Sequence, residues 1–151
     1  MTPELSHVFD IEANLGPIRD LGAMPHGRRR IVPILGGSVR GPRLEAEVVP
    51  GGADWQHIRA DGVAELVARY SIRTGDGVEI TVTNSGLRRA SPEVMERMAR
   101  GEAVDPALVY CRTVPLFEAP PGPYAWLNAS VFVATAARLP DKIHVEVFEV
   151  L

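Results

Sequence analysis

Two alternating runs joined by a tight turn constrain the fold of this chain more than any other feature. The runs span residues 64–74 and 78–88, and apolar residues recur at every second position over 64–72 and 78–82. A period of two is the pattern of a β-strand that turns one face to the protein interior. Residues 74–77 contain Asp-Gly, which is typical of a tight hairpin turn. The sequence therefore predicts a long β-hairpin whose inner face carries Ala64, Leu66, Ala68, Tyr70, Ile72, Val78, Ile80 and Val82.

The inner face of this predicted hairpin changes from apolar to polar along the second run. The even positions continue as Asn84, Gly86 and Arg88, and the glycine leaves space between the two polar side chains. Burial of a polar group without a hydrogen-bond partner costs about 1–3 kcal/mol. Inward-facing Asn84 and Arg88 should therefore have a use, either structural or functional.

The rest of the chain is dominated by short predicted strands linked by turns. Glycine and proline residues predict turns at 36–37 and 50–52 and a second hairpin turn at 61–62. Residues 15–27 are predicted to form a loop. Alternation and β-branched or aromatic residues predict strands at 5–11, 30–35, 39–49, 56–60, 107–117, 124–135 and 142–151.

One short helix interrupts the strands. Ser91 is a predicted N-cap, Pro92 suits the first helical turn, and Gly101 ends the segment. Roughly eight or nine strands joined mostly by tight turns favour antiparallel pairing between neighbours. We therefore predict a single all-β domain over residues 1–151, an antiparallel closed or nearly closed β-barrel with one short α-helix. A two-sheet sandwich is the alternative architecture.

Composition and residue spacing argue against several classes of function. The net charge of −3 and the absence of a basic run longer than residues 28–30 give no basis for nucleic-acid binding. Cys111 is the only cysteine, and the four histidines show no metal-ligand spacing, so we expect no metal. Glycine-rich segments do not precede a helix as a phosphate loop would, and we expect no cofactor. No apolar run approaches the about 20 residues that span a bilayer, and the N-terminus lacks a signal-peptide profile, so we expect a cytoplasmic protein without membrane contact.

Six segments, in this order, resemble the conserved segments of the domain of unknown function 3237 family of small bacterial and fungal proteins. They are G-G-S-V-R-G-P-R-L at 36–44, P-G-G-A-D-W at 50–55, R-A-D-G at 59–62, R-Y-S-I-R-T-G-D-G at 69–77, N-S-G-L-R at 84–88 and Y-A-W-L-N at 124–128. The resemblance covers nearly the whole chain and implies a compact β-barrel of about this length. It implies little about chemistry, beyond an association of a few fungal relatives with small terpenoid or polyketide intermediates. The family pattern continues with arginine after Trp-Leu-Asn, where this chain has Ala129.

Tyr70, Asn84 and Arg88 form the strongest predicted ligand-binding set, because alternation turns all three inward. A phenol, an amide and a guanidinium can hydrogen-bond a carbonyl, an enol or a carboxylate. The alternative is a buried polar network that only stabilises the barrel.

Asp54 and Trp55 follow a Gly-Gly pair and are also candidates. Asp54 could act as an acid or base, and Trp55 could form a wall against a flat ligand. Alternatively, Asp54 caps the turn and Trp55 belongs to the core.

Two further pairs are candidate ligand-binding residues. Arg59 and Asp61 could join a polar cluster with Arg88, or could form a surface salt bridge beside the Asp-Gly turn. Trp126 and Asn128 share a face of a predicted strand and could line the same cavity, or could pack in the core.

Three classes of function remain. The first is a barrel that binds a small, largely apolar organic molecule with a carbonyl or acid group. The second is a cofactor-free isomerase or cyclase, acting on a small secondary-metabolite-like substrate that Tyr70, Asn84, Arg88 and Asp54 orient and polarise. The third is a structural protein with a filled barrel, in which the apolar segment 131–134 leaves homo-oligomer formation open. No nucleophile–base pair is visible, which argues against hydrolysis.

Overall fold

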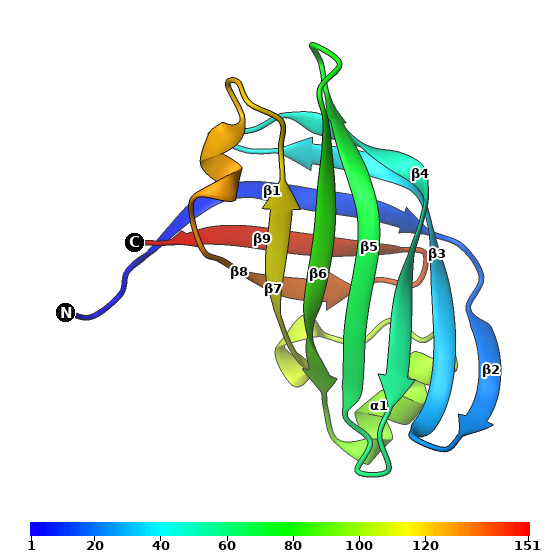
Figure 1. Cartoon of the computed structure of the whole chain (residues 1–151). Coiled ribbons are helices and arrows are strands. Elements are labelled where there is room, and N and C mark those ends of the chain that lie inside the picture. The colour runs from blue at the N-terminus through cyan, green and yellow to red at the C-terminus, as the bar shows by residue number, and fades with distance from the viewer.

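Eight antiparallel strands close into a barrel, and a ninth strand extends its wall (Figure 1). The computed structural model describes residues 1–151. Going round the barrel, the strands are β1 (Leu5–Leu15), β9 (Lys142–Val150), β8 (Phe132–Arg138), β7 (Tyr110–Glu118), β6 (Glu79–Arg89), β5 (Ala64–Thr74), β4 (Ala46–Ile58) and β3 (Gly27–Arg40). Strand β3 pairs again with β1 and closes the ring, while β2 (Arg19–Met24) pairs with the first part of β3. The predicted all-β closed barrel is confirmed.

Three short helical segments connect the strands. The predicted helix is α1 (Pro92–Ala99), and the side chain of Ser91 accepts a hydrogen bond from the Val94 amide as an N-cap does. Two 3₁₀ turns, η1 (Pro106–Leu108) and η2 (Ala125–Asn128), flank strand β7. Figure 1 shows α1 at one end of the barrel, beside the turns that join β4 to β5 and β2 to β3.

Several predicted boundaries were wrong. Residues 15–27 contain strand β2 in addition to loop, and the predicted turns at 36–37 and 50–52 lie inside β3 and β4. At both places the pairing register shifts, so each glycine pair forms a bulge that bends a long strand instead of ending it. The predicted strand at 124–135 begins as η2 and becomes a strand only at Phe132. Its aromatic residues favour a strand locally, but tertiary packing decides the conformation.

The barrel interior is apolar at one end and polar at the other, as the hairpin pattern predicted. Three phenylalanines fill the apolar end with edge-to-face contacts: Phe9 on Phe117 at a centroid distance of 5.6 Å, and Phe117 on Phe132 at 5.2 Å. Ile72 and Ile80 of the central hairpin are fully buried in the same cluster. This filled end forms a solid floor, so any internal space lies toward the end that carries α1.

The seam between β1 and β3 depends on Gly37. Its φ of +143° lies in a region that side chains disfavour, and a Cβ there would lie 1.9 Å from the carbonyl oxygen of Glu12 in β1. Only glycine allows the two backbones to approach this closely. The sequence places glycine where the ring must close.

Replacement of Gly37 by alanine is expected to lower the free energy of unfolding by more than about 2 kcal/mol, because it combines an unfavourable φ with a backbone clash. Urea denaturation followed by tryptophan fluorescence measures the loss. Gly75→Ala is the matched control, since a Cβ at Gly75 meets nothing within 4 Å and its φ is not in the left-handed region. Equal stability of the two variants would contradict this account of the seam.

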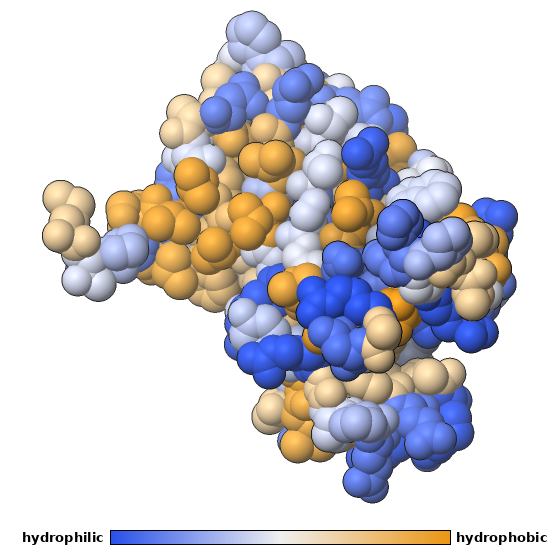
Figure 2. Space-filling model, turned by 60° about the horizontal axis from the view of Figure 1, so that its bottom comes forward, coloured by the Kyte–Doolittle hydropathy of each residue, from blue (hydrophilic) through white to orange (hydrophobic).

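Apolar side chains also lie on the outside of the barrel. Val114 and Leu116 of β7, Leu87 of β6 and Val131 before β8 are exposed. Figure 2 shows a contiguous hydrophobic area on one side of the molecule, beside the mixed surface at the α1 end. Homo-oligomer formation through such a face stays a prediction. No helix of the structure has the length and apolar character needed to cross a membrane.

Candidate functional site

The polar part of the interior is built in layers by the pairing of β5, β6 and β7. Tyr70, Val82 and Phe117 are cross-strand partners directly above the apolar floor. The next layers toward the α1 end are Ala68, Asn84 and Pro115, then Leu66, Gly86 and Thr113, and then Ala64, Arg88 and Cys111. The register therefore places Asn84, Thr113 and Arg88 at successive heights inside the barrel.

Strands β3 and β4 complete this polar interior from the other side. Arg30 pairs with Gln56, and Val32 pairs with Asp54. The Arg30 guanidinium donates two hydrogen bonds to Gln56 Oε1, at 2.8 and 3.1 Å, and Gln56 Nε2 donates one to Asp54 Oδ2 at 2.8 Å. A hydrogen-bonded chain thus runs from the barrel mouth inward and holds one oxygen of Asp54 in place.

These residues surround a small internal cavity of about 50 Å³. Its polar lining consists of Asp54, Gln56, Tyr70, Asn84, Arg88, Thr113 and Arg138, and apolar residues of β1, β3, β5, β8 and β9 complete it. A drug-sized ligand needs about 300–1,000 Å³. The cavity therefore has room for a few waters or for one functional group of a larger molecule.

A larger groove of about 590 Å³ lies outside the cavity, between the barrel mouth and α1. Arg88 and Arg138 line both spaces, so they stand at the junction, and Arg30 lines the groove. Helix α1 contributes Met95 and Met98 to the groove, and none of its residues is buried. Figure 2 looks toward this end and shows hydrophobic and hydrophilic side chains intermixed there.

Four of the polar side chains around the cavity carry a buried atom without a hydrogen-bond partner. These atoms are Asp54 Oδ1, Asn84 Oδ1, Arg88 Nε and Thr113 Oγ1. Asn84, Arg88 and Thr113 are 7%, 6% and 5% exposed, so bulk water does not satisfy them. More than nine in ten buried polar groups in proteins have a partner. Four exceptions around one cavity make it an incompletely hydrogen-bonded polar site.

Burial shifts the acid–base behaviour of this cluster. Burial raises the pKa of Asp54, against the lowering effects of its Gln56 hydrogen bond and of the nearby arginines. Burial lowers the pKa of the Arg88 guanidinium. Burial also raises the pKa of the Tyr70 phenol, and the neighbouring Asp54 charge adds to this effect. The Tyr70 hydroxyl therefore stays protonated and can donate a hydrogen bond.

The structure brings four of the predicted site residues together at this cavity: Asp54, Tyr70, Asn84 and Arg88. The alternation that placed the last three inward is confirmed by the pairing of β5 with β6. Their role in ligand binding remains a prediction.

The other five predicted residues lie elsewhere. Trp55 is 51% exposed on the outer face, because neighbours in a strand point to opposite sides and Asp54 points inward. Arg59 and Asp61 lie beyond the end of β4 and form an exposed salt bridge of 2.6 Å.

Trp126 and Asn128 belong to η2, away from the cavity. Trp126 packs on Phe132 at the apolar end, under the Arg43 guanidinium. The side-chain amide of Asn128 pairs with the backbone N–H and C=O of Ala119, both at 2.8 Å. Both residues stabilise the connection between β7 and β8.

Four residues of the site were missed from the sequence: Arg30, Gln56, Thr113 and Arg138. Each lies two positions from an inward-facing residue of its own strand, namely Val32, Asp54, Cys111 and Ala136. Extension of the two-residue period along each strand would have found them.

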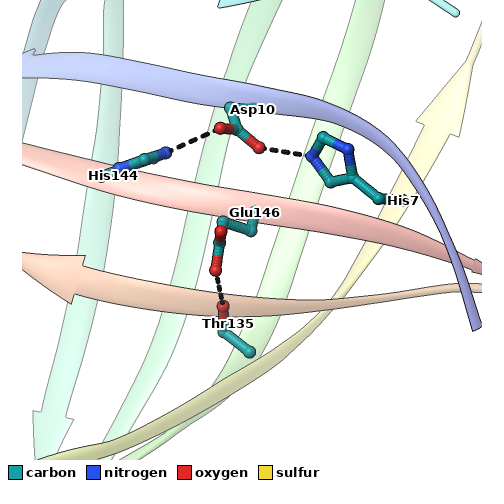
Figure 3. A network of polar contacts seen from close by, with 5 residues as sticks. All are labelled: His7, Asp10, Thr135, His144 and Glu146. Atoms are coloured by element: carbon teal, nitrogen blue, oxygen red, sulfur yellow. Dashed lines mark hydrogen bonds and ion pairs between the residues drawn. The ribbon is translucent and has the colours of Figure 1, made fainter. Parts of the chain in front are cut away.

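A second polar cluster lies on the outer surface of β1 and β9 (Figure 3). The Nε2 atoms of His7 and His144 contact the two oxygens of Asp10 at 2.6 and 3.0 Å. Burial of Asp10 favours its neutral form, but these hydrogen bonds outweigh burial and lower its pKa. Each histidine contacts a different oxygen of Asp10, so both carboxylate oxygens have a hydrogen-bond partner. The contact with His144 links β1 to β9.

The fold and the cavity together define a small closed β-barrel with an incompletely hydrogen-bonded polar interior beneath an open groove. A model of the family described as protein of unknown function (DUF3237) matches residues 3–150, and the chain belongs to this family. The UPF0311 protein RPA1785 of Rhodopseudomonas palustris is 42% identical over the full length of both chains. The crystal structure of RPA1785 superposes with a TM-score of 0.97, covering 100% of this chain and 99% of that one.

Two further solved structures share the fold. A protein of unknown function from Clostridium acetobutylicum is 36% identical with a TM-score of 0.91, covering 100% of this chain and 99% of that one. An enzyme from Penicillium herquei is 23% identical with a TM-score of 0.74, covering 100% of this chain and 96% of that one. At this identity the likeness shows the fold alone.

The raised pKa of Asp54 predicts the effect of Asp54→Asn on stability. The folded state favours the protonated acid, so the wild type loses stability as the pH rises from the ordinary pKa of 3.8 through the folded value. Asparagine resembles the protonated acid and avoids this loss. We expect Asp54→Asn to be more stable than the wild type at pH 7, with the difference vanishing near pH 3, in urea denaturation measured across this range.

Asp61→Asn is the control, because the pKa of Asp61 is lowered whereas that of Asp54 is raised. The Arg59 guanidinium and the Val63 amide lower the pKa of Asp61 to about 2, so its charge favours folding above the ordinary pKa. This variant should be no more stable than the wild type at pH 7. If the wild type is more stable than Asp54→Asn at pH 7, the prediction is wrong, and the surroundings of Asp54 stabilise its charged form.

Proposed function

We propose that this protein binds a small organic molecule, largely apolar and bearing a carbonyl or acid group, inside the α1 end of its barrel. The observation that supports this most strongly is the set of four buried, unpartnered polar atoms on Asp54, Asn84, Arg88 and Thr113 around one cavity. A structural network would satisfy these groups within the protein, because each unpartnered group lowers stability.

Both spaces of the site take part in this binding. The cavity of about 50 Å³ accepts the polar group of the ligand, and the groove of about 590 Å³ accepts its body. Thr113 and Tyr70 offer hydroxyl groups, and Arg88 offers a charged donor. Asn84 and Asp54 each leave an oxygen free to accept a hydrogen bond, so a hydroxyl or enol beside the carbonyl of the ligand fits as well.

A second candidate function is a cofactor-free isomerase or cyclase, and one observation favours it. Asp54 is the carboxylate of the cavity, its pKa is raised, and its Oδ1 is free. Such a group can take a proton from a carbon beside a carbonyl and return it at another carbon, while the donors nearby stabilise the enolate. A pure binder uses Asp54 only as an acceptor.

Native mass spectrometry of the purified protein, followed by denaturing extraction and small-molecule analysis, tests binding. We expect the wild type to retain a compound and Arg88→Ala to lose it, because truncation of a buried charged donor costs about 2–5 kcal/mol, or about 30-fold or more in Kd. Arg69→Ala is the control, since Arg69 is exposed on β5 and outside the cavity.

The outcomes separate the candidates. A wild type without any adduct, whose Tm is also unchanged by a panel of small acids, ketones and aldehydes, would contradict the proposal and favour a filled structural barrel. Conversion of the retained compound by the wild type, abolished in Asp54→Asn with Kd little changed, would identify an enzyme.

A further inference from the structure

Three arginines line this site without a carboxylate partner: Arg88 and Arg138 at the junction of the cavity and the groove, and Arg30 on the groove side. The side chain of Arg88 forms no hydrogen bond or ion pair, and its Nε is buried. The Arg30 guanidinium donates to the neutral amide of Gln56, and Arg138 Nε donates to the backbone carbonyl of Leu139 at 2.9 Å. Buried or partly buried guanidinium groups normally pair with carboxylates or other anions.

The acidic residues around the groove are already paired with other cations. Asp20 binds Arg28 at 2.7 Å. Glu96 lies 3.7 Å from Arg100, and Glu102 lies 3.1 Å from Arg100 and 3.6 Å from Arg97. Asp54 is the remaining carboxylate, and Gln56 occupies its Oδ2. Two of the three positive charges at the junction therefore have no counter-charge even when Asp54 is ionised.

The three guanidinium groups also act on one another. Burial lowers the pKa of Arg138, and the charges of Arg88 and Arg30 lower it further. Burial and the charge of Arg88 likewise lower the pKa of Arg30. An anion placed between these groups would remove this repulsion and offset part of the cost of burying them.

The shape of the site limits what the anion carries. The cavity fits one small group, and the adjoining groove is lined by apolar side chains, among them Ile18, Met95, Met98, Val104 and Leu139, together with charged ones. A free inorganic anion would leave this apolar surface uncovered. A molecule with a single anionic head and an apolar body matches both spaces.

We propose that the ligand is a monocarboxylic acid with an apolar body, whose carboxylate binds among Arg30, Arg88 and Arg138 while its body lies in the groove beside α1. This inference rests on the proposed function and narrows it from a carbonyl or acid to a carboxylate. Guanidinium groups bind carboxylates through two parallel hydrogen bonds, and the unpartnered Nε of Arg88 supplies a donor for such a pair.

Three probes with one naphthalene body test the inference: 2-naphthoate, 2-naphthamide and 2-naphthylmethylammonium. Isothermal titration calorimetry at pH 7 measures the Kd of each for the full chain. We expect 2-naphthoate to bind about tenfold or more tightly than the neutral amide, which corresponds to a hydrogen bond to a charged group. The ammonium probe should bind more weakly than either.

Two variants connect this preference to the arginines. In Arg88→Met and in Arg138→Met we expect the preference for naphthoate over naphthamide to fall at least about threefold, because loss of a guanidinium weakens binding of the charged carboxylate more than binding of the neutral amide. Arg88→Met removes an unpartnered buried charge and so should fold at least as stably as the wild type. Arg69→Met removes the same charge from the outer surface of β5 and should keep the preference.

Equal Kd values for naphthoate and naphthamide would overturn the carboxylate assignment while leaving a carbonyl-binding barrel in place. An unchanged preference in both Arg88→Met and Arg138→Met would also overturn it. If none of the three probes binds at millimolar concentration, this inference fails, whereas the proposed function is decided separately by whether the purified protein retains a compound in native mass spectrometry.

Discussion

The contact between β1 and β3 is the interaction on which the rest of this structure depends. Without it, the strands would form an open, twisted sheet with two exposed edges and no interior. With it, every inward-facing position of eight strands faces a common space, and residues far apart in the sequence become neighbours. The close approach of Gly37 to the Glu12 carbonyl makes this closure possible. The two glycine pairs that bend β3 and β4 give these long strands the curvature of the barrel wall.

Closure creates an interior with two opposing halves. Phenylalanine, isoleucine and valine side chains fill one half and supply the hydrophobic stabilisation of the barrel. The other half buries an arginine, an asparagine and a threonine without full hydrogen bonding, and this lowers stability. Proteins commonly keep such unfavourable arrangements at sites that serve a function. The solid floor also restricts access to the α1 end, so that cavity, arginines and groove form one continuous site.

Paired and unpaired charges lie in different parts of this site. Acidic side chains at the rim are paired with Arg28, Arg97 and Arg100, while the side chain of Arg88, deeper in the barrel, has no partner. Positive charge therefore increases toward the interior of a protein whose net charge is −3. Overall charge gave no basis for predicting a nucleic-acid surface, and it carried no information about this local excess. Membership of a family described only as proteins of unknown function leaves the chemistry of this site as the main guide to its role.

The sequence by itself determined the elements whose pattern is local. The hairpin of β5 and β6, the inward position of Asn84 and Arg88, the capped helix and the all-β class follow from two-residue alternation, turn residues and an N-cap. The opposite positions of Asp54 and Trp55 also follow from alternation, although both were predicted to line the site. Only the tertiary structure decided that Arg30, Gln56, Thr113 and Arg138 join Asp54 and Arg88, because strand pairing across β3, β4, β6, β7 and β8 brings them together. It likewise placed Trp126 and Asn128 away from the cavity, in a 3₁₀ turn where the Asn128 side-chain amide pairs with the Ala119 backbone. Periodicity specifies which way a side chain points, whereas register and closure specify what it meets.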